Sequence, residues 1–292
     1  MKFQFIQDHR SQFRVEKMCK VLGVSRSGFY KWRVSPPSER KKRREELTKR
    51  IKYHYDDHDG IYGSPKITKI LRREKFTVGE KTVGRIMREH NLRSVVIKKY
   101  RVQTTDSNHN FPIAYNWLNQ HFDVCTRPNQ VWVADITYIR TRQGRLYLAS
   151  VMDLYTRKVV GWQLGARMTE DLVLQALDKA YKAQTPAKGL IHHSDRGSQY
   201  AAATYRKRLK SYHMIRSMSR RGNCYDNACI EAFHSILKRE LVYRLRFQTK
   251  HEAQQRLFWY IEFFYNRKRI HSSLEDLSPD RYESQYYERN RQ

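Results

Sequence analysis

The sequence predicts an α/β core preceded by purely helical units. From residue 130 three strand-like segments come first, and helices then alternate with two further strands. This order is typical of a mixed five-stranded sheet with an antiparallel flank. Residues 3–90, in contrast, show only helical patterns. A chain of 292 residues is long enough for about two domains with buried cores.

The strands of the core are apolar segments that end at turn residues. Residues 131–139 form an apolar, β-branched and aromatic run, which indicates a strand buried on both faces. The residues Arg142, Gln143 and Gly144 favour a hairpin to the next strand. We expect strands at 130–140, 145–154, 158–167, 189–194 and 214–218, and helices at 169–183, 199–212 and 226–243.

The first 35 residues predict three short helices, at 3–9, 14–22 and 25–32. Gly23 ends the second helix, and Ser25 is a suitable N-cap for the third. The pattern is typical of a helix-turn-helix whose third helix enters the major groove of DNA, and a small packing bundle that touches no DNA is the alternative. The expected core side chains are Val15, Met18, Leu22, Val24, Phe29 and Trp32, and the expected DNA contacts are Arg26, Ser27, Tyr30 and Lys31.

A second helical unit and a connector are predicted next. Its first helix is so highly charged that it either exposes a solvated face or binds the DNA backbone. Ser64 as N-cap and Pro65 at the first helical position begin the following helix. The expected elements are a charged helix at 39–55, helices at 66–73 and 80–90, and an extended basic connector over 94–129.

The segment after residue 245 predicts a helical extension. A helix at 251–267 is rich in aromatic residues, most of which we expect in the core, and the polar tail 271–292 is expected to fray. The predicted domains are a helix-turn-helix unit (1–35), a basic helix with a second helix-turn-helix-like unit (36–93), the connector (94–128), the α/β core (129–245) and the C-terminal extension (246–292).

The formal net charge of +29 is spread over both halves of the chain. Residues 1–110 carry 28 lysines and arginines against 12 acids, and residues 111–292 carry 30 against 17. Two basic regions imply a polyanionic partner met over a wide surface, as in nucleic-acid binding. We expect no membrane partner and a cytoplasmic protein, because no segment is long and apolar enough to cross a bilayer.

The four cysteines are scattered through the chain without a CxxC pair. They are Cys19, Cys125, Cys224 and Cys229. We expect reduced thiols rather than a structural zinc site, with Cys224 and Cys229 acting as packing residues.

Three carboxylates occupy positions that a purely structural protein rarely gives to acids. Asp135 interrupts the buried first strand, Asp195 closes the fourth, and Glu231 shares the polar face of its helix with Asn227 and Lys238. Oxygen-only ligation by such acids suits Mg²⁺ or Mn²⁺, and two ions can clamp the attacking and leaving oxygens of phosphoryl transfer. The alternative is a set of acids neutralised by nearby arginines.

The spacing and surroundings of these acids resemble a known family. The first two acids are separated by 59 residues and the last two by 35. The run His-His-Ser-Asp-Arg-Gly-Ser-Gln-Tyr spans 192–200, and Gly-Asn-Cys-Tyr-Asp-Asn-Ala spans 222–228. With these motifs the chain closely resembles the catalytic protein of two-frame bacterial insertion sequences, within the retroviral-integrase-like transposases that carry an Asp-Asp-Glu triad. The likeness covers nearly the whole chain, with further matching runs at 129–132, 144–148, 152–162 and 265–267.

The resemblance implies a ribonuclease-H-like fold in which the first and fourth strands are neighbours and bring Asp135 beside Asp195. It implies a DNA transposase that binds the element's terminal inverted repeats, nicks them to free 3′-hydroxyls and joins these to target DNA. Two Mg²⁺ or Mn²⁺ ions are expected, with Asp135 as the shared ligand and Asp195 and Glu231 each completing one ion. A homo-oligomer, at least a dimer, acting at the bacterial nucleoid is also implied.

Several polar residues near the triad are further candidates. We expect Asn223, Tyr225 and Asn227 to touch DNA near the active site, and His193 to orient a ligand or contact the scissile phosphate, unless it is paired with a backbone carbonyl. On the glutamate helix two stripes are expected on opposite faces: Asn227, Glu231, His234 and an exposed Lys238 along the DNA path, and Ile230, Phe233 and Leu237 against the sheet.

Two other functions remain open at this point. A ribonuclease-H-like nuclease without joining activity keeps the same triad but does not need two helix-turn-helix-like units. A DNA-binding repressor keeps the basic N-terminal half but has no use for a buried Asp135.

Overall fold

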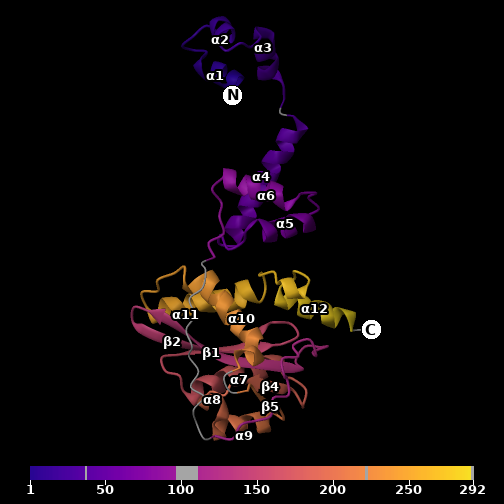
Figure 1. The fold of residues 1–292 in the computed structure, drawn as a ribbon, viewed down its shortest axis with the longest axis vertical. Coiled ribbons are helices and arrows are strands. Elements are labelled where there is room, and N and C mark those ends of the chain that lie inside the picture. Colours follow the sequence, from indigo (N-terminus) through magenta and orange to yellow (C-terminus); the bar gives the residue numbers. More distant parts are fainter. Residues whose placement is uncertain (37, 97–110, 221–222, 291–292) are drawn as a thin grey trace.

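The computed structural model describes residues 1–36, 38–96, 111–220 and 223–290. Helical units lie at one end of an elongated molecule and the sheet with its helices at the other (Figure 1). Within the described ranges, none of the helices combines the length and the apolar character needed to span a bilayer. Part of the predicted connector, 97–110, lies outside the described residues.

The N-terminal unit is the expected bundle of three short helices. Ser25 caps the third helix, because its hydroxyl accepts a hydrogen bond of 3.0 Å from the Gly28 backbone N–H. The core differs from the prediction at Trp32, which is 40% exposed because so small a bundle cannot enclose an indole ring. The helices are α1 (Lys2–His9), α2 (Val15–Val21) and α3 (Arg26–Val34), and their buried core consists of Ile6, Met18, Cys19 and Phe29.

The second helical unit also has the predicted three helices. They are α4 (Glu39–Asp57), α5 (Ser64–Arg73) and α6 (Glu80–Glu89). Gly63 is the N-cap of α5, so the helix begins one residue earlier than predicted from Ser64, and Pro65 lies in its first turn.

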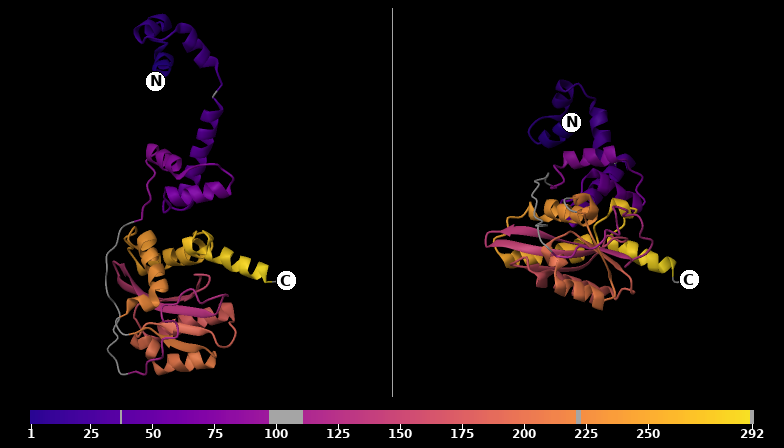
Figure 2. Two further views of the ribbon diagram at one scale, coloured as in Figure 1. Left: turned by 45° about the vertical axis from the view of Figure 1, so that its right-hand side comes forward. Right: turned by 60° about the horizontal axis from the view of Figure 1, so that its bottom comes forward.

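The sheet has five strands in the order β3-β2-β1-β4-β5, as the ribonuclease-H-like prediction requires. Two further views show the sheet and its helices below the N-terminal helical units (Figure 2). β1 pairs antiparallel with β2, and β2 with β3, whereas β4 is parallel to both β1 and β5. The strands are β1 (Val131–Thr141), β2 (Gly144–Asp153), β3 (Val159–Gly165), β4 (Ile191–Ser194) and β5 (Ile215–Met218).

Helices cover both faces of this sheet. One face packs against α7 (Glu170–Gln184), α8 (Ser198–Ala201) and α9 (Ala203–Ser211), around buried Trp132 and Leu177. Gly161 on β3 permits this packing, because a Cβ there would lie 2.4 Å from the Ala176 carbonyl oxygen of α7. The single helix predicted at 199–212 is broken at Ala202, whose extended backbone (ψ 150°) separates α8 from α9.

The other face is covered by α10 (Ala228–Leu237). The helix predicted at 226–243 is composite, because a 3₁₀ turn (η1, Cys224–Asn227) precedes α10 and a π-helical turn (η2, Lys238–Val242) follows it. The helix predicted at 251–267 likewise divides into α11 (Lys250–Phe258) and a π-helical segment (η3, Trp259–Tyr265). Of its aromatic residues Tyr260, Phe264 and Tyr265 are buried, whereas Phe258, Trp259 and Phe263 are at least 40% exposed.

The expectation of a frayed C-terminal tail was wrong for α12 (Pro279–Arg289). The Ser278 hydroxyl caps this helix, and Lys158 forms ion pairs of 2.8 Å with Asp280 and 2.7 Å with Glu283. Tyr155 packs against two tyrosine rings of the same helix. The polar composition hid a helix that is held by partners distant in sequence.

The described part of the connector is extended but firmly attached. Met218 on the edge strand β5 donates a backbone hydrogen bond of 3.4 Å to the Tyr115 carbonyl, and Trp117 N–H donates to the Ser217 hydroxyl at 3.0 Å. Leu118 is buried in the same core as α10. Residues 111–118 therefore cover the edge of the sheet.

Candidate active site

The parallel pairing of β1 and β4 brings two of the three acids together. Ala134 pairs with Ser194 at the last position of the ladder, and Asp135 and Asp195 are the next residues on the two strands. Adjacent strands lie about 4.8 Å apart, and equivalent positions of a parallel pair face the same side of the sheet. The two aspartates therefore lie side by side where the ladder ends.

The buried Tyr200 is influenced by the charges of both aspartates. Tyr200 on α8 is 3% exposed, and its hydroxyl has no hydrogen-bond partner among the described residues. Burial raises the pKa of Tyr200 well above its usual value, and the charges of Asp135 and Asp195 raise it further. Both carboxylates therefore act on one ring.

The carboxylate of Asp195 is oriented by the turn that follows β4. Its Oδ1 accepts a hydrogen bond of 2.9 Å from the Gly197 backbone N–H. A Cβ at position 197 would lie 3.1 Å from that oxygen, so a side chain there would crowd the carboxylate. The glycine lets the backbone approach the acid closely.

Glu231 reaches the site from α10, which packs against β1. Ile230, Phe233 and Leu237 are buried between helix and sheet, as predicted, whereas Glu231 is exposed. One turn before the glutamate, Asn227 Nδ2 donates a hydrogen bond of 3.1 Å to the Ala134 carbonyl.

About one turn after the glutamate, His234 makes a second contact between α10 and β1. Its Nδ1 lies 3.2 Å from Oδ2 of Asp135, and its Nε2 lies 3.2 Å from the Ser150 hydroxyl on β2. Since Asn227 and His234 hold the helix to β1 at positions 134 and 135, Glu231 between them is placed at the same end of the strand. The sequence placed His234 on this stripe but gave it no role.

The loop before α10 is fixed by a fully buried carboxylate, Asp226. It accepts hydrogen bonds from the Arg220 backbone and guanidinium at 2.8 to 3.0 Å. Asn116 and Gln120 of the connector donate to the same carboxylate at 2.9 and 2.8 Å. Although burial opposes ionisation, these donors and the Arg220 charge lower the pKa of Asp226 below its usual value. The sequence analysis missed this residue, although it lies inside the 222–228 motif.

Comparison with known proteins identifies the family. Residues 125–224 and 213–279 each match the family described as "Integrase core domain", and residues 42–100 match "HTH-like domain". The chain is 45% identical over 271 residues to "Insertion element IS600 uncharacterized 31 kDa protein" of Shigella sonnei, with 93% of this chain and 99% of that protein covered. It is 38% identical over 286 residues to "Transposase InsF for insertion sequence IS3A" of Escherichia coli (strain K12), with coverage of 97% and 99%.

The chain belongs to the insertion-sequence transposases. Its fold is ribonuclease-H-like, with the integrase sheet order and a helix-turn-helix-like region ahead of it. Among solved structures, the HTLV-2 integrase catalytic core in complex with magnesium aligns with a TM-score of 0.43 at 15% identity, covering 54% of the transposase and 98% of that chain. A simian T-cell lymphotropic virus intasome aligns with a TM-score of 0.47 at 15% identity, covering 80% and 73%.

Two of the predicted DNA contacts are buried in the transposase. His193 is inaccessible, with Nδ1 2.8 Å from the Ser217 hydroxyl and Nε2 3.2 Å from that of Ser219. Its imidazole also interacts with the Asp226 backbone, as the alternative of a backbone-paired histidine expected, and it is too deeply buried to meet a phosphate. Asn227 is 2% exposed and bonded to β1. The prediction that these two side chains touch DNA was wrong, because the sheet and α10 enclose them.

The other predicted contacts near the triad lie closer to the surface. Tyr225 is 68% exposed, and Asn223 is partly exposed and caps η1 by accepting from the Tyr225 N–H at 3.0 Å. Lys238 is half-buried rather than exposed, with Nζ 4.8 Å from the centre of the Tyr138 ring. Burial lowers the pKa of Lys238, whereas the negative charge of Asp135 acts to raise it. Lys238 thus belongs to the electrostatic surroundings of the triad.

On the N-terminal unit the four predicted contacts share one exposed helix. Arg26, Ser27, Tyr30 and Lys31 of α3 are all exposed, and Arg26 is 3.8 Å from Glu16 of α2. This surface is accessible to a DNA groove. Whether it touches DNA stays a prediction.

Three side chains whose spacing would allow them to hold a metal ion lie in the second helical unit. Among the described residues, His54, Asp57 and His58 of α4 form the trio whose ligand atoms all lie within 4.8 Å of one another. Its members already have partners, since His54 bonds Glu74 at 3.0 Å and Asp57 pairs with Lys268 at 2.6 Å. The ligand atoms of Asp135, Asp195 and Glu231 do not all lie within 4.8 Å of one another.

The other metal-related prediction concerned the thiols. Cys19, Cys125 and Cys229 are free thiols, as expected, and Cys229 packs against the α10 core. The side chain of Cys224 lies outside the described residues.

Proposed function

We propose that this transposase cuts the phosphodiester backbone at the ends of its element and joins the freed 3′-hydroxyls to target DNA. Asp135, Asp195 and Glu231 are the proposed catalytic residues and metal ligands. The observation that supports this proposal is that Asp135 and Asp195 directly follow a paired position of β1 and β4, and that His234 of the glutamate helix α10 bonds Asp135. Glu231 is exposed on α10 between Asn227 and His234, the two residues that bond β1.

The chemistry of the donor set fits Mg²⁺ or Mn²⁺. All three side chains offer hard carboxylate oxygens, and the Asn227 Oδ1 nearby is a buried oxygen without a partner among the described residues. Two such ions, when bound, would lower the pKa of the attacking water or hydroxyl and neutralise the negative charge that develops on the leaving 3′-oxygen.

His234 is a positioning residue in this proposal. With its proton on Nδ1, the imidazole donates to Asp135 Oδ2 and accepts at Nε2 from the Ser150 hydroxyl. Asp135 then keeps its second oxygen, Oδ1, for a ligand. The imidazole fixes the rotamer of the carboxylate without taking part in the reaction.

The proposed polyanionic partners are the terminal inverted repeats and target DNA. The net charge of +29 and the exposed face of α3 support them. Joining two ends at one target requires at least two active sites, so we propose a homo-oligomer, at least a dimer, that works at the bacterial nucleoid.

A strand-transfer assay with a pre-cut donor end tests the function. Wild-type protein with Mg²⁺ is expected to produce joined DNA, and Asp135→Asn is expected to abolish both cutting and joining while DNA binding and the melting temperature are retained. Hydrolysis without joining would favour a nuclease, and neither product would favour a repressor. If Asp135→Asn fails to fold, Asp135 is a structural acid and the proposal is wrong.

A further inference from the structure

A strongly basic groove lies between α9 and β5, on the face of the sheet opposite α10. Its volume is about 480 Å³. Leu209 and Met214 are buried and form an apolar floor. The residues that line it are Arg206, Leu209, Lys210, His213, Met214 and Arg216. Four of the six are therefore basic, and none is acidic.

The cations of this groove are uncompensated. The adjacent Arg208 of α9 is paired with Asp178, but Arg206, Lys210 and Arg216 form no ion pair within the described parts of the chain. Arg206 Nε is buried without a hydrogen-bond partner. The fold thus keeps two guanidinium groups and an ammonium group close together without a counter-charge.

The two arginines also act on each other. Arg216 Nη2 donates a hydrogen bond of 2.8 Å to the Pro112 carbonyl of the connector, which holds its side chain in place. Burial lowers the pKa of Arg216, and the nearby charge of Arg206 lowers it further. Two neighbouring guanidinium groups that repel each other gain most from an anion with several oxygens, because each can donate paired N–H groups to it.

We propose that this groove binds a backbone phosphate of duplex DNA. This inference rests on the proposed function, because that function makes DNA the polyanion that the protein binds. Arg206 and Arg216 donate to the phosphate oxygens, and Lys210 at the rim adds a mobile charge. Phosphate oxygens carry no sequence information, so a groove that binds a phosphate contributes affinity rather than sequence preference.

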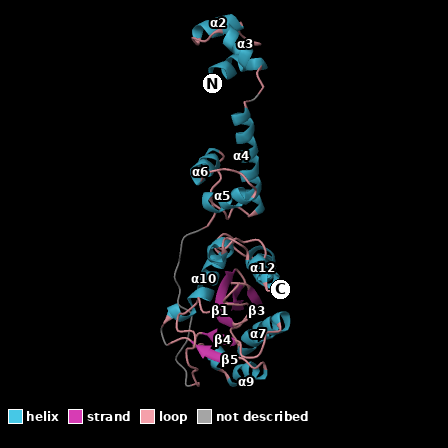
Figure 3. Cartoon of the chain, turned by 90° about the vertical axis from the view of Figure 1, so that its right-hand side faces the viewer, coloured by secondary structure: helices cyan, strands magenta, loops and turns pink. Residues whose placement is uncertain are grey.

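The position of the groove separates it from the other candidate DNA contacts. Arg216 pairs with His192 on β4, three residues before Asp195, which places it about 10 Å along the strand from the proposed active site. α9 and β5 lie at the end of the molecule farthest from the N-terminal helices (Figure 3).

The salt dependence of DNA binding tests the groove. The full chain and Arg206→Gln/Lys210→Gln are titrated with a 30-base-pair duplex over a series of KCl concentrations. Each lost phosphate contact reduces the slope of log K against log salt by about 0.9, so the double variant, which weakens the contact with one phosphate, is expected to lose up to about 0.9 units of slope. The matched control is Lys182→Gln/Lys207→Gln, which removes two exposed lysines that do not line the groove.

An unchanged slope in the groove variant, or an equal loss in the control, would overturn the proposal. Melting curves verify folding, and Lys210→Gln alone, at the exposed rim, serves if Arg206→Gln is unstable. Inorganic phosphate is the second probe: stabilisation of wild type by phosphate, combined with an unchanged DNA slope in the variant, would identify a free-anion site instead. Strand transfer by wild type is scored separately, so failure of the proposed function is distinguishable from failure of the groove.

Discussion

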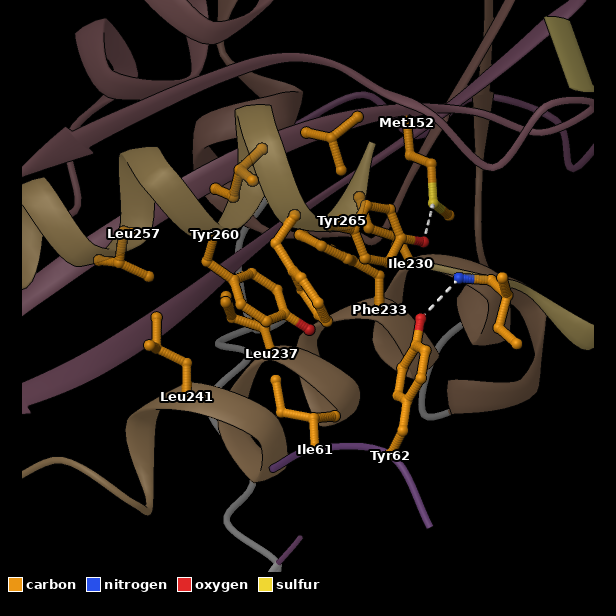
Figure 4. Close-up of a cluster of buried hydrophobic side chains, with 14 of the residues drawn as sticks. Ile61, Tyr62, Met152, Ile230, Phe233, Leu237, Leu241, Leu257, Tyr260 and Tyr265 are labelled. Atoms are coloured by element: carbon orange, nitrogen blue, oxygen red, sulfur yellow. Dashed lines mark hydrogen bonds between the residues drawn. The ribbon is translucent and has the colours of Figure 1, made fainter. Parts of the chain in front are cut away.

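The two helical units ahead of the sheet differ in how they are attached. The second unit, α4 to α6, is docked on the catalytic part: its Tyr62 hydroxyl accepts a hydrogen bond of 2.9 Å from Ile270 N–H, and Ile61 and Tyr62 join the core formed by α10 and η3 (Figure 4). The N-terminal unit, residues 1–35, has a separate core of four side chains.

This difference indicates a division of labour. A docked unit keeps a fixed orientation to the active site, so it can set where DNA runs past the triad. A unit with its own core can move independently of the catalytic part, which would suit the predicted recognition of a specific DNA sequence. The following predictions test this division, from the largest effect to the smallest.

The buried ion pair at the junction should carry the largest stability effect. Glu240 accepts hydrogen bonds of 2.9 and 2.8 Å from Arg269 and 2.7 Å from Tyr260. Glu240→Ala leaves the Arg269 charge buried and unpaired, and should lower the free energy of unfolding by about 3 to 5 kcal/mol in urea titrations.

The control is the double variant Glu240→Met/Arg269→Met, which should recover most of that loss because it removes both charges. The helices of the N-terminal unit should persist in the single variant. Their simultaneous loss would show that the two units unfold together and would contradict the division.

The N-terminal unit should contribute specificity. If α3 enters the major groove, Arg26→Ala should weaken binding to element ends by about 1 to 3 kcal/mol more than binding to random duplex. Lys17→Ala, at an exposed position of α2, is the matched control. Equal losses on both DNAs would mean that α3 grips only the backbone.

Acid should destabilise the sheet before it affects the N-terminal core, which contains no histidine. Burial lowers the pKa of His193 to about 4 and that of His192 to about 3. Because both folded-state pKa values lie below the ordinary value, their stabilisation is complete above about pH 6.5 and is lost as the pH falls toward 4, at up to about 1.4 kcal/mol per pH unit for each histidine. Urea midpoints at several pH values measure this slope.

His193→Asn should remove one histidine's contribution, up to about 1.4 kcal/mol per pH unit, from the pH dependence of the unfolding free energy. Asparagine can still bond Ser217 but does not titrate. A slope identical to that of wild type would mean that His193 is protonated in the folded chain.

The partly exposed ion pairs between the second helical unit and the C-terminal residues should contribute least to the unfolding free energy. Lys268 pairs with Asp57 at 2.6 Å, but both side chains are about a third exposed. Lys268→Met should therefore cost less than about 1 kcal/mol of unfolding free energy. The Lys69→Met variant, which loses an equally short pair with Asp276, should behave alike. A loss of several kcal/mol would mean that charges rather than apolar packing dock the second unit.

Much of the catalytic fold could be predicted because its signals are local. The apolar run of β1 and the helical spacing of Ile230, Phe233 and Leu237 are properties of neighbouring residues, and they gave the right strand and the right helix face. The same spacing put Glu231 on the exposed side. The pairing of β1 with β4 came from family resemblance, since no local pattern specifies it.

The rest depends on contacts between distant residues. Tyr62 and Ile270 are 208 positions apart, so nothing near either residue signals that the second unit is docked. The polar composition of α12 concealed a helix because its partner Lys158 lies on another element. His193 and Asn227 were wrongly assigned to DNA since a polar residue beside a motif has no local sign of its burial.

The Asp226 carboxylate gives the connector a mechanical role. Asn116 and Gln120, on the path from the DNA-binding helices, are fastened to the same side chain that immediately precedes Asn227 and the catalytic helix. Five hydrogen bonds hold this carboxylate. A displacement of the connector should therefore also move the start of α10. Glu231 lies five residues beyond Asp226, so the described end of the connector is tied to the helix that carries the proposed catalytic glutamate.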